Sequence, residues 1–459
     1  MEAFWDYSVW GFFNIFAILL VSLLVANALK KGIPALEASL IPTSVLAGIL
    51  LLVFSMIYDQ FAPVKLFDSK LFGENGYAYM EMITYHTLAL GFIAGSLKTT
   101  GGKLSKKRAV EIFNTGVTTV STYLVQAVVG MGFTMIVALV LPGFFQAAGL
   151  LLPFGYGQGT GQAMNYGNIY ESQFGFIGGK SFGLTVAALG FLSASIGGVV
   201  HLNILKKRGQ IKMKKSQEGA ITENEIQSLD EIPMQESIDK FTIQVALITL
   251  SYLLAYVLMW ILGNLIPGMK AVIYGFNFLL GVLGATLVKW IHNSLYRKKV
   301  IRHKYINDFL MTRVSNVCFD VMVVAGIAAI RLGDLGRYWW ILLVLGVVGL
   351  LVTYAYNRLV AKKLFPAYAE EQFLMMYGML TGTASTGVIL LREIDGEFRT
   401  PAADNMVYQN FPAIVFGFPM MLLATLAPQK PTLAFILLLL FFIAMNVLLF
   451  RSFLFKKRK

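Results

Sequence analysis

Two short segments rich in glycine and hydroxyl residues are the parts of this 459-residue sequence best suited to bind a ligand. The first reads FGYGQGTGQ from residue 154, and the second reads YGMLTGTAS from residue 377. An ungapped alignment matches three pairs of residues: Gly155 with Gly378, Gly159 with Gly382, and Thr160 with Thr383. Glycine at this density interrupts a helix. An interrupted helix exposes backbone N–H and C=O groups, which can bind carboxylates and cations.

Backbone carbonyls and threonine hydroxyls can replace the water shell of Na⁺, while helix N-termini attract a carboxylate. Glycines in apolar segments also serve close helix packing, but two aligned copies favour a binding site. Pro153, just before the first segment, is expected to help break the incoming helix. The predicted substrate- and ion-binding residues, with Thr160 and Thr383 near Na⁺, are Gly155, Gly157, Gln158, Gly159, Thr160, Gly161, Thr381, Gly382, Thr383, Ser385 and Thr386.

Two charged residues join this set as candidates. Asp320 lies in the middle of an apolar run and shares a helical face with Arg313 and Asn316. It is a cation ligand, a proton carrier or a structural charge paired with another residue. Arg392 follows the second segment and either recognises a carboxylate or anchors the chain at the cytoplasmic surface.

The composition indicates a membrane protein. Hydrophobic residues make up 57% of the chain, charged residues only 14%, and the mean hydropathy is +0.67; soluble domains carry roughly 25% charged residues. The net charge of +13 resides mostly in loops, which favours membrane orientation over nucleic-acid binding. The single Cys318 and four scattered histidines suggest neither disulfide nor metal centre. We therefore expect no enzyme activity and no cofactor. Na⁺ is expected only as an ion whose movement is coupled to that of the substrate.

Hydropathy predicts about eleven spans in an all-α polytopic fold. They lie at about 8–29, 40–58, 80–98, 109–141, 180–205, 241–265, 270–291, 308–330, 337–361, 405–427 and 432–450. The glycine-rich segments, about 145–170 and 371–395, fall between spans. The span at 109–141 is rich in threonine, for packing or to line a pathway, and Pro412 and Pro419 indicate kinks.

The basic loops all fall on one side of the membrane only if each glycine-rich segment turns back within the membrane and leaves it on the side where it entered. Two re-entrant hairpins of opposite orientation then make an inverted repeat. The predicted parts are an N-terminal repeat 1–205, a cytoplasmic linker 206–240, an inverted repeat 241–430, and an extra span with a basic tail 431–459. The first apolar segment is a retained span rather than a signal peptide, with the N-terminus outside and the C-terminus cytoplasmic.

These motifs resemble those of the bacterial sodium–glutamate symporter family. The run GYGQGT at 155–160 is similar to its first hairpin tip, with Gln158 at the place of a histidine, and GTAST at 382–386 is similar in character to its second. The run IPTSVLAG at 41–48 also resembles an early motif of that family. The resemblance implies Na⁺-coupled glutamate uptake across the bacterial cytoplasmic (inner) membrane. It further implies a homodimer in which a hairpin-bearing domain moves like an elevator against a scaffold.

Two other functions stay open at this point. A symporter for hydroxycarboxylates or other small anions, coupled to Na⁺ or H⁺, shares this general architecture. A passive ion channel is the alternative of a different class, although interrupted helices at mid-membrane favour a site that can be occluded.

Overall fold

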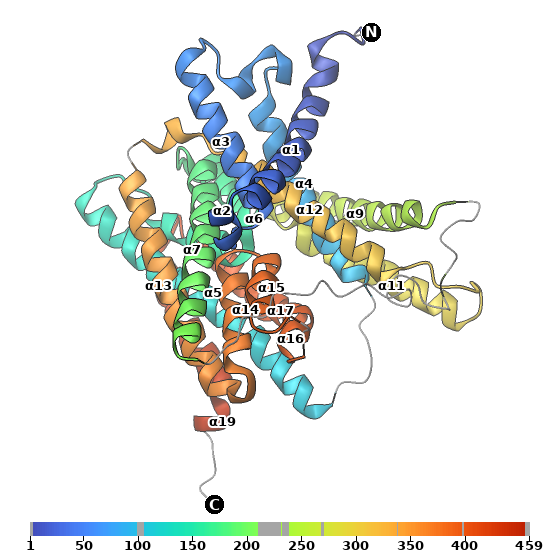
Figure 1. Cartoon of the computed structure of the whole chain (residues 1–459), viewed down its shortest axis with the longest axis vertical. Helices are drawn as coiled ribbons and strands as arrows, with labels where there is room; N and C mark the ends of the chain where they lie inside the picture. Colours follow the sequence, from blue (N-terminus) through green and yellow to red (C-terminus); the bar gives the residue numbers. More distant parts are fainter. Residues whose placement is uncertain are drawn as a thin grey trace, which may run out of the picture. The chain divides into compact units, whose positions relative to one another are not determined.

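The chain folds as an all-helical protein (Figure 1). The computed structural model describes residues 3–98, 105–209, 231, 238–267, 270–336, 338–396 and 399–454. Within these ranges extended pairing is limited to one bridge between Glu231 and Lys304. Most of the predicted linker and the tail at Lys456–Lys459 lie outside the described residues.

The chain divides into two compact units that each draw on both halves of the sequence. The first unit comprises Met1–Leu20, Ser55–Gly102 and Glu218–Gly326. Its helices are α4 (Gly76–Leu97), α9 (Lys240–Leu265), α10 (Lys270–Gly275), α11 (Asn277–Arg297) and most of α12 (Asp308–Ala328), with the short η1 (Leu66–Asp68) and η2 (Lys70–Phe72). Buried Ile93, Ile248 and Val288 form part of its core, where α4, α9 and α11 pack together.

The second unit comprises Val21–Phe54, Lys103–Gln217 and Ile327–Lys459. Its helices are α2 (Pro34–Ala38), α5 (Lys106–Val140), η3 (Gln146–Leu150), α6 (Leu151–Phe174), α7 (Gly179–Lys207), η5 (Leu332–Leu335), α13 (Trp339–Leu364), η6 (Pro366–Tyr368), α14 (Ala369–Thr381), α15 (Ala384–Arg392), α16 (Ala402–Tyr408), α17 (Asn410–Leu426), α18 (Pro431–Leu449) and α19 (Arg451–Leu454). Helices α1 (Tyr7–Gly32) and α3 (Thr43–Phe61) contribute to both units. Both glycine-rich segments therefore belong to the second unit.

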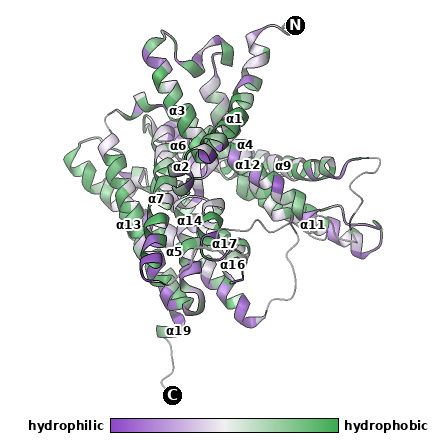
Figure 2. Cartoon of the chain, viewed as in Figure 1, coloured by the Kyte–Doolittle hydropathy of each residue, from purple (hydrophilic) through white to green (hydrophobic). Residues whose placement is uncertain are grey.

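The protein is polytopic. Among the described residues nine helices are long and apolar enough to span a membrane, or ten if α16 and α17 are one bent span. Figure 2 shows apolar residues along helices such as α9 and α13. Helix α4 coincides with the predicted span at 80–98 but is not among the nine. The span predicted at 270–291 begins later, at Asn277, because the short α10 precedes it.

Of the two kinks predicted at prolines, the one at Pro412 is confirmed and the one at Pro419 is not. The axes of Ala402–Tyr408 and Pro412–Leu426 differ by 54°, and Pro412 lies at this joint, where its missing N–H removes one helical bond. Pro419 lies inside α17, which continues through it.

Candidate functional site

The first glycine-rich segment reverses direction at Gly159. Its φ of 81° and ψ of −173° interrupt α6 and belong to a region of backbone space open essentially to glycine alone. The rings of Phe154 and Tyr166 stack with centroids 3.8 Å apart; twelve residues of straight helix would separate them by about 18 Å. The two halves of α6 therefore lie side by side as a first hairpin.

The second glycine-rich segment reverses in the same way. Helix α14 ends at Thr381, and α15 begins at Ala384. A Cβ placed on Gly378 would lie 2.8 Å from the Cα of Gly387, so the two helices pack against each other as a second hairpin. Gly159 and Gly382, paired by the sequence alignment, are thus the two interruption points.

The expected role of Pro153 is wrong. Helix α6 begins at Leu151 and continues through Pro153 to the interruption six residues later. Pro153 lies in the first helical turn, where a missing N–H removes no intrahelical hydrogen bond.

Helix α5 holds both hairpin tips, which we define as residues 155–162 and 380–384. The Tyr123 hydroxyl donates to the Gly157 carbonyl at 3.1 Å. The Gln126 amide donates to the Leu380 carbonyl at 2.9 Å and to the Thr353 hydroxyl of α13 at 2.8 Å. Carbonyls at an interrupted helix end lack their usual intrahelical donors, and these α5 side chains supply donors instead. Figure 1 places α5 beside α14, in agreement with their contact.

The half-helices that leave the tips begin without side-chain caps. Gly159 has no side chain, and Thr383 makes no capping bond with its hydroxyl, which lies 3.4 Å from the Thr386 hydroxyl. Uncapped N-terminal N–H groups with a positive dipole end attract anions. Within the described structure, the amide nitrogens of Gln158 and Gln162 are buried without an acceptor. The first tip is thus rich in donors suited to a carboxylate.

The same region offers oxygen atoms for a cation. The Gln126 side-chain oxygen is buried and receives no hydrogen bond from any described residue. Thr160 and Thr381 are fully buried at the tips, as is Thr386 just beyond the second tip in α15, although the Thr381 hydroxyl donates to the Tyr377 carbonyl. The described residues hold no cluster of three His, Cys, Asp or Glu side chains for a metal. A cation at the tips would therefore bind hydroxyl and carbonyl oxygens, which suit Na⁺ better than a transition metal.

Several tip glycines serve close packing, the other role open to them. A Cβ on Gly155 would lie 2.8 Å from the Ala187 backbone of α7, and one on Gly157 would overlap the Tyr123 ring. Gly190 of α7 lies where the hairpins meet, since its Cβ would contact the Thr381 carbonyl and Tyr156. Any larger side chain at these positions would push the hairpins away from their supports.

Charged residues fix the base of the second hairpin. The Glu370 carboxylate accepts two bonds of 2.5 Å from Arg358 of α13 and lies 2.9 Å from Nε2 of His201 on α7. At the exit, the Asp395 carboxylate accepts N–H bonds from Arg399 and Thr400. Burial raises the pKa of Asp395, but the hydrogen bonds from Thr400 and Arg399 outweigh it and hold that pKa below its usual value.

The remaining predicted residues lie elsewhere. Asp320 is on the exposed face of α12 in the first unit, as are Arg313 and Asn316, and its link to the tips stays a prediction. Arg392 is the last residue of the nine-residue α15, about 13 Å along the helix from the second tip. The side chain of Ser385 lies outside the described structure.

Sequence reasoning did not single out Tyr123 or Gln162, and it named Gln126 only as one of the polar residues of a span that either packs against other helices or lines a pathway. The signal for Gln126 was the run of hydroxyl residues on one face of its span, which ends with a buried amide. Gln162 stood at the end of the first glycine-rich run, four residues after Gln158 in the sequence.

A polytopic helical protein that holds two interrupted helices against common supports has the architecture of a secondary transporter. Comparison with known families agrees: the family described as sodium/glutamate symporter matches residues 11–369. The chain belongs to the sodium/glutamate symporter family. It is therefore a transporter and not an enzyme, and membership supports Na⁺-coupled glutamate symport.

The matched region has a boundary that matters for the site. It includes the first hairpin and α5 but ends as α14 begins, so assignment of the second tip depends on the internal repeat and the geometry. A search of curated proteins finds no match to this chain.

The conformation of Gly159 generates a first prediction. Gly159→Ala forces a side chain into a backbone region essentially closed to it, so we expect loss of transport. Gly175→Ala is the control, because Gly175 also has a positive φ of 72° but is an ordinary left-handed helix end with open space around it; it should cost about 1 kcal/mol of unfolding free energy and retain transport. Uptake and thermal unfolding of both variants test this, and normal uptake by Gly159→Ala would contradict it.

A second prediction concerns Gln126. Gln126→Leu leaves the Leu380 carbonyl without its α5 donor, which should destabilise the protein by about 1–3 kcal/mol and reduce transport strongly. Asn446→Leu on α18 removes an amide bonded to Tyr356 and Phe442, in contacts that do not involve the tips. The midpoint temperature of thermal unfolding should fall in both variants, whereas the initial rate of glutamate uptake should fall only in Gln126→Leu. Equal loss of uptake in both would refute a specific role at the tip.

Proposed function

We propose that the two hairpin tips together form the binding site for glutamate and Na⁺. The observation that carries this is the shared support by α5, which donates to the carbonyl ends of both interrupted helices. With those carbonyls satisfied, the uncapped N-termini after Gly159 and Thr383 and the amides of Gln158 and Gln162 are available for substrate carboxylates.

The sodium ion has oxygen ligands in the same place. We assign it to the region of Thr160, Thr383 and the free side-chain oxygen of Gln126. Sodium entry compensates the substrate charge, because moving one negative charge inward against the membrane potential costs about 2.3 kcal/mol per 100 mV. Asp320 is retained as a proposed contributor to cation coupling from α12.

The proposed topology has eleven spans, with α4 as one and α16–α17 as another, and the hairpins as two re-entrant elements of an inverted repeat. We place the N-terminus outside and the C-terminus inside a bacterial cytoplasmic membrane, by the charge asymmetry of the loops. The second unit, which carries both hairpins, is the proposed moving domain of a homodimer, and the first unit is its scaffold.

Transport provides the main test. In proteoliposomes an inward Na⁺ gradient should accumulate glutamate above its outside concentration, because the ion gradient supplies the free energy, and a sodium ionophore should abolish the accumulation. Radiolabelled glutamate measures this, with choline replacing Na⁺ as the control. Glutamate that merely equilibrates would instead indicate a passive channel, and accumulation in Na⁺-free buffer would indicate proton coupling.

Topology is tested separately by cysteine labelling. In a Cys318→Ser background, a cysteine introduced at Lys212 should react with an impermeant thiol reagent only after the cells are permeabilised. A cysteine introduced at Ala3 should react in intact cells. Labelling of position 212 in intact cells would contradict the inverted repeat.

A further inference from the structure

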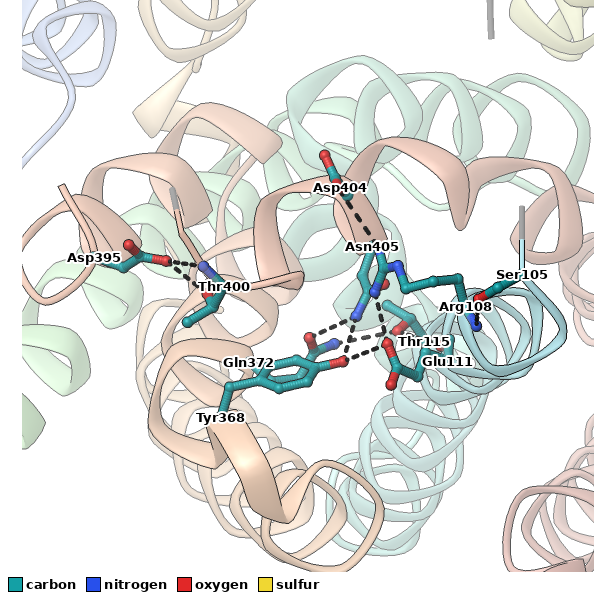
Figure 3. A network of polar contacts seen from close by, with 10 residues as sticks. All are labelled: Ser105, Arg108, Glu111, Thr115, Tyr368, Gln372, Asp395, Thr400, Asp404 and Asn405. Atoms are coloured by element: carbon teal, nitrogen blue, oxygen red, sulfur yellow. Dashed lines mark hydrogen bonds and ion pairs between the residues drawn. The ribbon is translucent and has the colours of Figure 1, made fainter. Parts of the chain in front are cut away.

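A polar network joins α5, η6, α14 and α16 in the second unit (Figure 3). At its outer end Arg108 donates to Glu111 at 2.6 Å and lies 3.6 Å from Asp404, whose side chain is 70% exposed. At its inner end Thr115, Gln372 and Asn405 are fully buried. The network thus runs from a charged edge into the interior.

Glu111 fixes the direction of the outer hydrogen bonds. An ionised carboxylate can only accept, so the Tyr368 hydroxyl donates its one proton to Glu111 at 3.1 Å. The Tyr368 oxygen must then accept, and it does so from the Asn405 amide nitrogen at 3.0 Å. One of the two N–H groups of Asn405 is committed in this way.

The second N–H group of Asn405 is committed by a parallel chain. The Thr115 hydroxyl donates to the backbone carbonyl of Glu111 at 2.8 Å, so it accepts from the Gln372 nitrogen at 3.2 Å. The Gln372 oxygen consequently faces Asn405 and accepts from its amide nitrogen at 3.2 Å. The Asn405 oxygen is left over, and no described residue donates to it.

Gln409 repeats this pattern one helical turn later. Its amide nitrogen is directed to the Asn410 oxygen at 3.1 Å and the Met379 sulfur at 3.6 Å, and its oxygen receives no donor from the described structure. The Gln409 N–H donates to the Asn405 carbonyl, so both side chains occupy one face of α16. They are 0% and 2% exposed, too buried for bulk water to serve as the donor.

The joint between α16 and α17, directly after Gln409, lacks one helical hydrogen bond. Pro412 has no N–H, so the Tyr408 carbonyl cannot receive the usual helical bond from that residue. The chain bends by 54° here. Freed carbonyls at a helix break are characteristic cation ligands in transporters.

We propose that Asn405 and Gln409 form a second monovalent-cation site, distinct from the hairpin tips, that binds Na⁺. Hard cations prefer oxygen ligands, and the two leftover atoms are both oxygens. The carboxylates of Glu111 and Asp404 against the guanidinium of Arg108 leave the network with one net negative charge, which favours a cation over a neutral water. The inference rests on the proposed sodium coupling but assigns the ion a second place.

The site also couples the ion to the second hairpin. Gln372 belongs to α14 and bonds to Asn405, while Met379, near the end of the same helix, contacts Gln409. A cation bound by the two oxygens would therefore hold α16 in the arrangement that supports α14.

The test uses the full-length protein with Na⁺ as the probe and choline as the inert replacement. Asn405→Leu and Gln409→Leu each remove one oxygen ligand, so the Na⁺ concentration for half-maximal thermal stabilisation and for half-maximal glutamate uptake should rise about tenfold. Gln409→Glu should lower it, because a carboxylate binds a cation more strongly. Asn446→Leu is the matched control: Asn446 is an asparagine of α18 whose side chain bonds to Tyr356 and to the Phe442 carbonyl, in contacts that involve neither the tips nor this network.

The outcomes separate this site from the tips. Unchanged Na⁺ dependence in Gln409→Leu and Gln409→Glu, with wild-type coupling intact, would show that the oxygens bind an ordered water and would overturn the proposal. An equal shift in Asn446→Leu would overturn it as well, since the effect would then be structural. Absence of any Na⁺ dependence in the wild type would instead refute the proposed function itself.

Discussion

A helix interrupted inside a membrane leaves carbonyls at one end and N–H groups at the next without intrahelical partners, and lipid supplies none. Much of the second unit serves to supply hydrogen-bond partners to these backbone groups. In both hairpins, the carbonyl at the end of the incoming helix accepts a hydrogen bond from a side chain of α5: Gly157 from Tyr123, and Leu380 from Gln126. The N-terminal ends are left without side-chain caps, so a substrate bound there as proposed would complete their hydrogen bonding.

Helix α5 is long enough to serve the whole second unit. Its 35 residues carry a polar face that begins at the partly exposed Arg108 and Glu111 and continues, buried, from Thr115 to Gln126. Threonines on this face satisfy their own hydroxyls by bonding to the preceding turn, which costs little in an apolar environment. The same helix therefore contacts the charged network near its N-terminus and both tips near its middle.

The sequence predicted those parts of the fold that depend on local pattern. Glycine density and the pairing of Gly159 with Gly382 located both interruptions, because only glycine adopts the first of these conformations. It could not predict the capping, since Gln126 and Leu380 are 254 residues apart and an amide among threonines has no unique partner. It placed the effect of Pro153 wrongly, because proline in a first turn and proline in a helix interior look alike before the helix start is known.

Helix α5 lies in the N-terminal half of the chain, yet it caps the hairpin of the C-terminal half. If the two halves arose by gene duplication, they no longer evolve independently, because the second hairpin depends on a hydrogen-bond donor from α5. A substitution at position 126 in one half must be compensated at the second tip in the other half. Recombination that exchanged halves between diverged relatives would therefore combine a hairpin with an α5 that does not supply its hydrogen-bond donor. Selection should therefore transmit the two halves as one inherited unit.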